Sequence, residues 1–197
     1  MDSQYFFLKN RKEKSKHRHQ KESIKMKTLV ILAHPNLASS RINKAWAERV
    51  KKEENVYVHD LYANYPDFKI DVEKEQELAV QFDRIVFQFP FYWYSSPALL
   101  KEWQDVVLTY GWAYGSKGTK LQGKEFVVAT STGGPAEAYQ EGGYNRYPMN
   151  HLLLPFQAMA NLTGMKFQTP FLFQGAGGDL SDKVIQDSAE SYARLLR

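Results

Sequence analysis

The chain has 197 residues, of which 43% are hydrophobic and none is cysteine. This length and composition suit a single domain with a substantial core, and they exclude disulfides, thiolate metal ligands and a cysteine nucleophile. The net charge of +4 comes from residues 1–25, which hold eight Lys and Arg residues and three Asp and Glu residues. The remaining residues hold 18 Lys and Arg and 19 Asp and Glu. This part of the chain therefore lacks the basic surface of a nucleic-acid-binding protein.

Residues 1–25 are predicted to be a basic, disordered leader ahead of a folded domain over 26–197. The segment is polar, has no periodic apolar face and ends just before a second methionine, Met26. Its short apolar part, Tyr5–Leu8, precedes the charges, which is the reverse of the order in a secretory signal. A tail attracted to acidic surfaces or nucleic acid is the alternative. No apolar run approaches the roughly 20 residues of a membrane-spanning helix, so no transmembrane segment is expected. The absence of cysteine is compatible with a reducing cytoplasm, which is the expected location.

Strands and helices are predicted to alternate from Lys27 to the C-terminus. The expected elements, in chain order, are a strand over 28–33, a helix over 40–53, a strand over 56–60, a helix over 72–82, a strand over 85–89, a helix over 97–107, a strand over 126–130, a helix over 149–162, a strand over 166–173 and a helix over 179–196. Pro155 is expected to kink its helix or delay its start, and Pro170 to bend the last strand or place it at an edge. The alternation predicts an α/β fold, in which helices cover both faces of a sheet of five parallel strands.

The loops after the first, third and fourth strands form the candidate site, because ligands bind such sheets at the carboxyl ends of the strands. The first of these loops is His34–Arg41. A helix N-terminus favours anions, Ser39 and Ser40 add hydroxyl donors, and Arg41 adds a cation. These features indicate a phosphate site. The alternatives are that the serines only cap the helix and that His34 is a structural histidine.

Four consecutive aromatic residues mark the second loop, in the stretch QFPFYWYSSP over 88–97. They are Phe91, Tyr92, Trp93 and Tyr94. One or two of them can be core residues, but a loop cannot bury four consecutive rings on one side. Their rings offer flat apolar surface with polar edges. The stretch therefore predicts the wall of a pocket for a flat ligand.

Two glycines directly follow the fourth strand in the third loop, Ser131–Pro135. Gly133 and Gly134 permit a tight turn and a close approach of the backbone to a ligand, and Thr132 provides a hydroxyl. An ordinary turn is the alternative. The next stretch, 136–148, is rich in glycine and tyrosine, and loops of this length are usually functional or disordered.

The three loops together fit one ligand, a flavin, which combines a planar ring with polar edges and a phosphate tail. The GxGxxG dinucleotide fingerprint, the Walker P-loop and the GxSxG elbow are all absent from the sequence. The histidines lack the spacing of metal ligands, so no metal site is predicted.

Three motifs resemble those of the flavodoxin-like NAD(P)H:quinone oxidoreductases. They are AHP with SSR over 33–41, QFPFYWYSSPALLKEW over 88–103 and STGG over 131–134. Within that family the sequence resembles in particular the small bacterial proteins of the general stress protein 14 type and the ancillary flavoproteins of glutathione-gated potassium efflux. The resemblance runs from about Met26 to the C-terminus and leaves the predicted leader outside it.

The resemblance implies a flavodoxin-like three-layer sandwich with strand order 2-1-3-4-5, and a homodimer with active sites at its interface. It also implies a ping-pong, two-electron hydride transfer from NAD(P)H through FMN to quinones or similar acceptors. FMN is expected as the cofactor, with FAD as the alternative, because the larger FAD-binding relatives have a longer C-terminal part.

The resemblance further implies roles for individual residues. The flavin phosphate would be held by Ser39, Ser40 and Arg41, and His34 would lie close to it. The ring and ribityl chain would be lined by Pro90, Phe91, Tyr92, Trp93 and Tyr94, and the polar edge of the ring would be bound by Ser131, Thr132, Gly133 and Gly134. Tyr139 matches a family tyrosine that stabilises charge on the reduced flavin, and Tyr144 stands where larger relatives have a histidine.

Two other functions are compatible with this fold. A regulatory ancillary subunit, docked peripherally on a potassium-efflux transporter, would have only incidental reductase activity. A flavodoxin-type electron carrier fits less well, because carriers have a Thr/Ser- and Gly-rich phosphate loop after the first strand and a strongly acidic surface.

Overall fold

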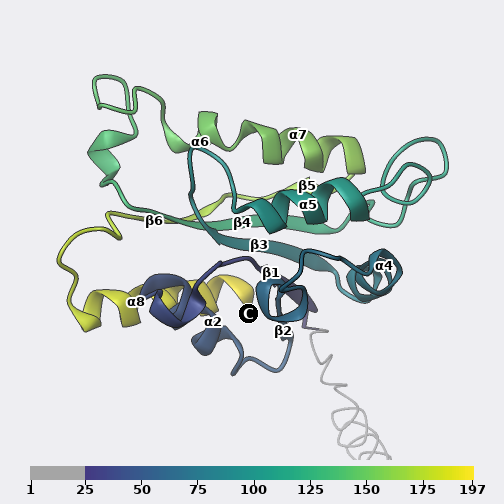
Figure 1. The fold of residues 1–197 in the computed structure, drawn as a ribbon, viewed down its shortest axis with the longest axis horizontal. Helices are drawn as coiled ribbons and strands as arrows, with labels where there is room; N and C mark the ends of the chain where they lie inside the picture. The colour runs from purple at the N-terminus through teal and green to yellow at the C-terminus, as the bar shows by residue number, and fades with distance from the viewer. Residues whose placement is uncertain (1–24) are drawn as a thin grey trace, which may run out of the picture.

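Within residues 25–197, six parallel strands form one sheet at the centre of the fold (Figure 1). The computed structural model describes residues 25–197, so the predicted leader lies outside the described residues apart from Lys25. The strands are β1 (Thr28–Leu32), β2 (Val56–Asp60), β3 (Arg84–Pro90), β4 (Glu125–Thr132), β5 (Lys166–Phe167) and β6 (Phe171–Gln174). Their order is β2-β1-β3-β4-β5, and β6 also pairs with β4. This order confirms the predicted flavodoxin-like topology.

The edge strand that pairs with β4 is split into β5 and β6, whereas the sequence predicted one strand over 166–173. In β5, Phe167 pairs with Phe126, and in β6, Phe171 pairs with Ala129. The segment between these two pairs is therefore one residue longer in the edge strand than in β4, as in a β-bulge. Pro170 lies in this break, where its missing N–H cannot contribute to the ladder. The prediction of one continuous strand was wrong, while the edge position that was one of the two expectations for Pro170 is confirmed.

Helices cover both faces of the sheet (Figure 1). On one face, α2 (Ile42–Val50) and α8 (Asp182–Leu196) pack through the fully buried Trp46 and Tyr192. The core on the other face includes residues of α3 (Leu61–Asn64), α4 (Val72–Val80), α5 (Ala98–Val107), α6 (Met149–Leu152) and α7 (Leu154–Thr163). Successive residues of β3 alternate between the two cores, with Val86 in the first and Phe87 in the second.

The predicted helices are all present, but their ends differ by a few residues. The predicted helix over 149–162 is broken at Leu153 into α6 and α7, and Pro155 stands in the first turn of α7, where its missing N–H is tolerated. The last helix begins at Asp182, and Ser181 caps it. The sequence did not predict α3, because four residues are too short to show helical periodicity. The described part of the chain also contains two short 3-10 helices, η1 (Leu37–Ser39) and η2 (Ala136–Ala138).

The carboxyl ends of the parallel strands share one edge of the sheet, where the loops after β1, β3, β4 and β6 meet. The loops that follow β4 and β6 lie on the left in Figure 1. Backbone hydrogen bonds join these loops, from Phe91 N–H to the Ser131 carbonyl (2.8 Å) and from Gly177 N–H to the Gly133 carbonyl (3.1 Å). The topology therefore brings the three predicted loops together and adds a fourth.

Candidate active site

A cavity of about 360 Å³ lies at this edge of the sheet. The residues that line it are His34, Ser39, Ser40, Arg41, Ile42, Asn43, Pro90, Phe91, Tyr92, Ser131, Gly133, Ala176 and Gly177. Most of the residues predicted to bind the cofactor are among them. The predicted residues outside the lining are Trp93, Tyr94, Thr132 and Gly134.

His34 follows β1 and has a defined tautomer. Its Nδ1 accepts a hydrogen bond from the backbone N–H of Asn36 (3.1 Å), so the neutral ring carries its proton on Nε2. Burial lowers the pKa of His34, although the negative charge of Asp60 acts in the opposite direction. At neutral pH the ring is therefore a hydrogen-bond donor in the cavity wall and not a cation.

The two serines of the first loop differ in their hydrogen bonds. Ser40 Oγ accepts from the backbone N–H of Asn43 (3.1 Å), which is the capping contact that the sequence left as an alternative. This contact leaves the hydroxyl proton of Ser40 available for an anion. Ser39 Oγ instead donates its proton to the carbonyl of Asn36 (3.0 Å). Helix capping and anion binding are therefore compatible at Ser40.

Arg41 connects the first loop to the beginning of α8. Its Nη2 donates to the carbonyl of Leu180 (2.7 Å) and to the carboxylate of Asp182 (3.2 Å). Both ionic side chains are well exposed, so the ion pair itself contributes at most about 1 kcal/mol to stability. The guanidinium has five N–H donors, and these two contacts leave others for an anion.

The aromatic stretch after β3 forms a tight turn that separates its rings. Tyr92 and Ser95 exchange two backbone hydrogen bonds (3.1 and 2.9 Å). The two residues between them have positive φ, 45° at Trp93 and 61° at Tyr94, which is the backbone of a turn usually built from Asn and Gly. Tyr92 lines the cavity, whereas Trp93 is 91% exposed. Such backbone strain is found mainly at functional sites.

Trp93→Gly is expected to raise the free energy of unfolding by about 1 kcal/mol relative to Trp93→Ala. A side chain at a φ of 45° carries a steric penalty of about 1–2 kcal/mol that glycine avoids, and the greater freedom of glycine in the unfolded chain offsets part of the gain. Both variants remove the indole, so the comparison isolates the backbone. Urea unfolding measures the difference, and an alanine variant at least as stable as the glycine variant would contradict the strained turn.

The glycine turn after β4 forms part of the cavity wall. Thr132 Oγ1 donates to the carbonyl of Gly134 (2.8 Å), so this hydroxyl stabilises the turn itself. A Cβ at Gly133 would meet no atom within 4 Å, whereas a Cβ at Gly134 would lie 2.4 Å from Oη of Tyr144. Gly133 therefore keeps the wall open, and Gly134 permits the close approach of Tyr144.

The two tyrosines predicted to be catalytic lie beside the cavity without lining it. Phe91, which does line it, stands edge-on to Tyr139 with ring centroids 6.3 Å apart. Burial raises the pKa of Tyr139. The Tyr139 phenol therefore keeps its proton at neutral pH. Tyr144 is 73% exposed and overlies the glycine turn.

The sequence reasoning missed four lining residues, which are Ile42, Asn43, Ala176 and Gly177. The last two lie in the GAGG stretch after β6. Their N–H groups donate to the carbonyls of Thr132 (2.8 Å) and Gly133 (3.1 Å) respectively, which packs the stretch against the glycine turn. Glycines directly after a predicted strand were the signal at β4, and the same signal at the last strand would have revealed this fourth loop.

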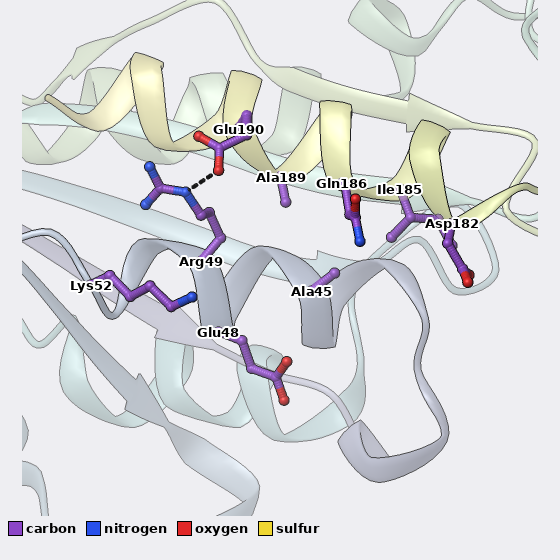
Figure 2. Close-up of a pocket in the computed structure, with 9 residues that line it drawn as sticks. All are labelled: Ala45, Glu48, Arg49, Lys52, Asp182, Ile185, Gln186, Ala189 and Glu190. Atoms are coloured by element: carbon purple, nitrogen blue, oxygen red, sulfur yellow. Dashed lines mark hydrogen bonds and ion pairs between the residues drawn. The ribbon is translucent and has the colours of Figure 1, made fainter.

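A second hollow, of about 440 Å³, lies between α2 and α8 (Figure 2). Ala45 and Ala189 project into it from the two helices, and charged side chains of both signs surround them. Arg49 Nε contacts Glu190 Oε1 across the groove (2.5 Å). Among the residues that the structure describes, no aromatic side chain lines this groove. It therefore lacks a surface for a flat ligand, and the cavity at the sheet edge is the candidate active site.

The family described as having the flavodoxin-like fold matches residues 26–196. The chain belongs to this family. The match begins directly after the predicted leader and includes every strand and helix of the structure.

Two curated bacterial proteins are similar over most of their length. The chain is 59% identical over 170 residues to general stress protein 14 of Bacillus subtilis, which covers 86% of this chain and 95% of the relative. It is 44% identical over 171 residues to the glutathione-regulated potassium-efflux system ancillary protein KefG of Yersinia enterocolitica, which covers 87% of this chain and 92% of the relative.

Two crystal structures share both fold and sequence with the chain. One is the general stress protein 14 of Treponema denticola in complex with FMN, with a TM-score of 0.83 and 42% identity over 86% of this chain and 97% of that one. The other is an NADPH-quinone reductase from P. pentosaceus, with a TM-score of 0.79 and 35% identity over 87% of this chain and 98% of that one.

Proposed function

We propose that this chain is an FMN-dependent NAD(P)H:quinone oxidoreductase that transfers two electrons as a hydride in a ping-pong cycle. The observation that carries the proposal is the cavity at the carboxyl edge of the sheet, where a helix N-terminus with free donors and an aromatic wall line one space. The similarity to an FMN complex and to an NADPH-quinone reductase supports the choice of cofactor and reaction.

The residues around the cavity fit FMN. A volume of about 360 Å³ lies within the range of small-molecule sites. Ser40, Arg41 and the N-terminus of α2 supply donors and positive charge for a phosphate, while Phe91 and Tyr92 supply flat surface for a ring. When bound, FMN would supply the two-electron chemistry between NAD(P)H and a quinone.

The chain's own residues would orient the cofactor and hold protons. His34, neutral at pH 7, would donate from Nε2. The missing side chain of Gly133 leaves room for the cofactor to approach the backbone. Tyr139 would act as a protonated donor beside the wall, because its raised pKa keeps the phenol from ionising.

Steady-state kinetics test this function. Initial rates with NADH or NADPH and a quinone are expected to give parallel double-reciprocal lines, because in a ping-pong cycle the first product leaves before the second substrate enters. We also propose that residues 26–197 suffice, so a chain lacking residues 1–25 should show the same rates. Intersecting lines would contradict the ping-pong cycle, and a large loss on truncation would contradict a dispensable leader.

A regulatory role on a potassium-efflux transporter is the second candidate function. The observation in its favour is the 44% identity to the KefG ancillary protein. In this role the chain would dock on the transporter from outside the bilayer. No helix within residues 25–197 is long and apolar enough to cross a membrane. Co-purification with a transporter of this class, together with a change in potassium flux, would support the regulatory role; unchanged flux in its presence would argue against it.

We further propose a cytoplasmic homodimer. Large exposed aromatic side chains are present on the loops next to the cavity, namely Trp93, Tyr94, Tyr144 and Tyr147. Exposed apolar patches of this kind mark interaction surfaces, and a cytoplasmic location would give the protein access to NAD(P)H. Light scattering should report twice the chain mass of 22.8 kDa, and a monomer at micromolar concentration would contradict the dimer.

A further inference from the structure

Asn43 is a buried polar residue in the first turn of α2 to which the sequence motifs assign no role. It is 1% exposed and contributes to the cavity lining. Its backbone N–H donates to Ser40 Oγ (3.1 Å), its carbonyl accepts from Gln88 Nε2 (2.9 Å), and its Nδ2 donates to Ser131 Oγ (3.0 Å). One residue thus joins the first loop, β3 and the end of β4.

The bond to Ser131 has a fixed direction. An amide nitrogen has protons and no acceptor capacity, so Ser131 Oγ must accept this bond. The hydroxyl of Ser131 therefore keeps its own proton for another partner. Within residues 25–197 the structure records no hydrogen bond that this hydroxyl donates, and Ser131 lines the cavity. A ligand in the cavity is the available acceptor.

We propose that Asn43 is a positioning residue that commits the Ser131 hydroxyl to act as a hydrogen-bond donor toward the bound flavin. Asn43 acts through Ser131, and two hydrogen bonds of its backbone, one to Ser40 and one from Gln88, hold the residue in place. A donor that is itself hydrogen-bonded is polarised and becomes a better donor. This inference rests on the proposed function, in which the cavity holds FMN.

An aspartate at position 43 would reverse the bond. A carboxylate only accepts hydrogen bonds. In the Asn43→Asp variant the Ser131 hydroxyl would therefore donate its proton to the new carboxylate and no longer to a ligand in the cavity. Shape and backbone contacts are kept, whereas the direction of one hydrogen bond changes. The new negative charge could also weaken phosphate binding, but that effect does not depend on the Ser131 hydroxyl. A double-mutant cycle with Ser131→Ala therefore separates the two effects.

The experiment measures the dissociation constant of FMN from the fluorescence of flavin released when the holoprotein is diluted. Ser131→Ala is expected to weaken binding about tenfold, as for the loss of one hydrogen bond, and Ser131→Thr, which keeps the hydroxyl, to restore it. Asn43→Asp should weaken binding at least fivefold more when Ser131 is present than when position 131 is alanine. The visible absorption band of the bound flavin should shift in the same direction in Ser131→Ala and Asn43→Asp.

Two results would overturn the inference. In the first, Asn43→Asp weakens FMN binding by the same factor with and without the Ser131 hydroxyl. The substitution would then act through structure or charge and not through Ser131. In the second, the flavin band is unshifted in both variants. If Asn43→Asp does not fold, Asn43→Ala in the same cycle replaces it, with a loss that should disappear in the Ser131→Ala background. A wild-type protein that binds no FMN would instead contradict the proposed function itself.

Discussion

Glu75→Ala is expected to lower the free energy of unfolding by about 3–5 kcal/mol, the range for breaking a buried ionic hydrogen-bond network. The Glu75 side chain lies in the first turn of α4 and is fully buried. Its carboxylate accepts hydrogen bonds from His59 Nε2 (2.8 Å), the Tyr65 hydroxyl (2.6 Å) and Trp103 Nε1 (2.8 Å). The alanine variant leaves three buried donors without an acceptor, and each unsatisfied group costs about 1–3 kcal/mol.

Glu77, an exposed residue of the same helix, provides the matched control. Glu77→Ala is expected to change the free energy of unfolding by less than about 0.5 kcal/mol. Urea unfolding of both variants measures the difference. Similar losses in the two would show that the Glu75 network does not stabilise the fold.

The same carboxylate makes stability depend on pH. Burial acts to raise the pKa of Glu75, but the hydrogen bonds from its three donors outweigh burial and hold the pKa below the ordinary value of 4.5. Because its pKa is lower in the folded state than in the unfolded state, the ionised Glu75 carboxylate stabilises the fold fully above pH 4.5. This stabilisation is lost as the pH falls through the pKa of Glu75 in the folded protein. Below pH 4.5, wild-type stability should therefore fall more steeply than that of Glu75→Ala.

Gly133→Val is expected to weaken FMN binding at least about 100-fold, or about 2.8 kcal/mol, while leaving the fold intact. Gly133 lines the cavity, and a Cβ at this position would meet no atom within 4 Å. The added side chain would therefore occupy space that the cofactor needs and would not displace any packed atom of the protein. The dissociation constant of FMN and the melting temperature are the two measurements.

Gly178→Val is the control for this substitution. Gly178 lies in the facing loop but does not line the cavity, and an added Cβ there would stand 3.4 Å from the Gly175 carbonyl. This variant is expected to keep its FMN. Unchanged FMN affinity in Gly133→Val, or equal losses in both variants, would place the cofactor elsewhere.

The inner strands could be located because parallel strands buried on both faces appear in the sequence as largely apolar runs, whereas their order was predicted from the resemblance to a known family. The runs at β1 and β3 are of this kind, and both strands are buried throughout most of their length. The break between β5 and β6 could not be located in the same way. Phe171 and Leu172 continue the apolar pattern after Pro170, and only the register against β4 reveals the extra residue.

The position of the candidate site followed from topology, but the direction of individual side chains did not. Loops at the carboxyl ends of parallel strands must meet, so the predicted loops share one cavity. Trp93 and Tyr94 lie outside its lining because their positive φ turns the chain directly after Tyr92. Nothing in the sequence QFPFYWYSSP signals that turn, which usually requires Asn or Gly. Asn43 was missed for a related reason, since its role depends on a bond to Ser131, 88 positions away.

The flavin content of the purified protein tests the central claim most directly. We expect a yellow protein that releases about one FMN per chain on denaturation, identified by its absorption spectrum and by chromatography. NAD(P)H should bleach the bound flavin in the absence of oxygen, and a quinone should restore its colour. A colourless protein that takes up no FMN on reconstitution would contradict the proposed function.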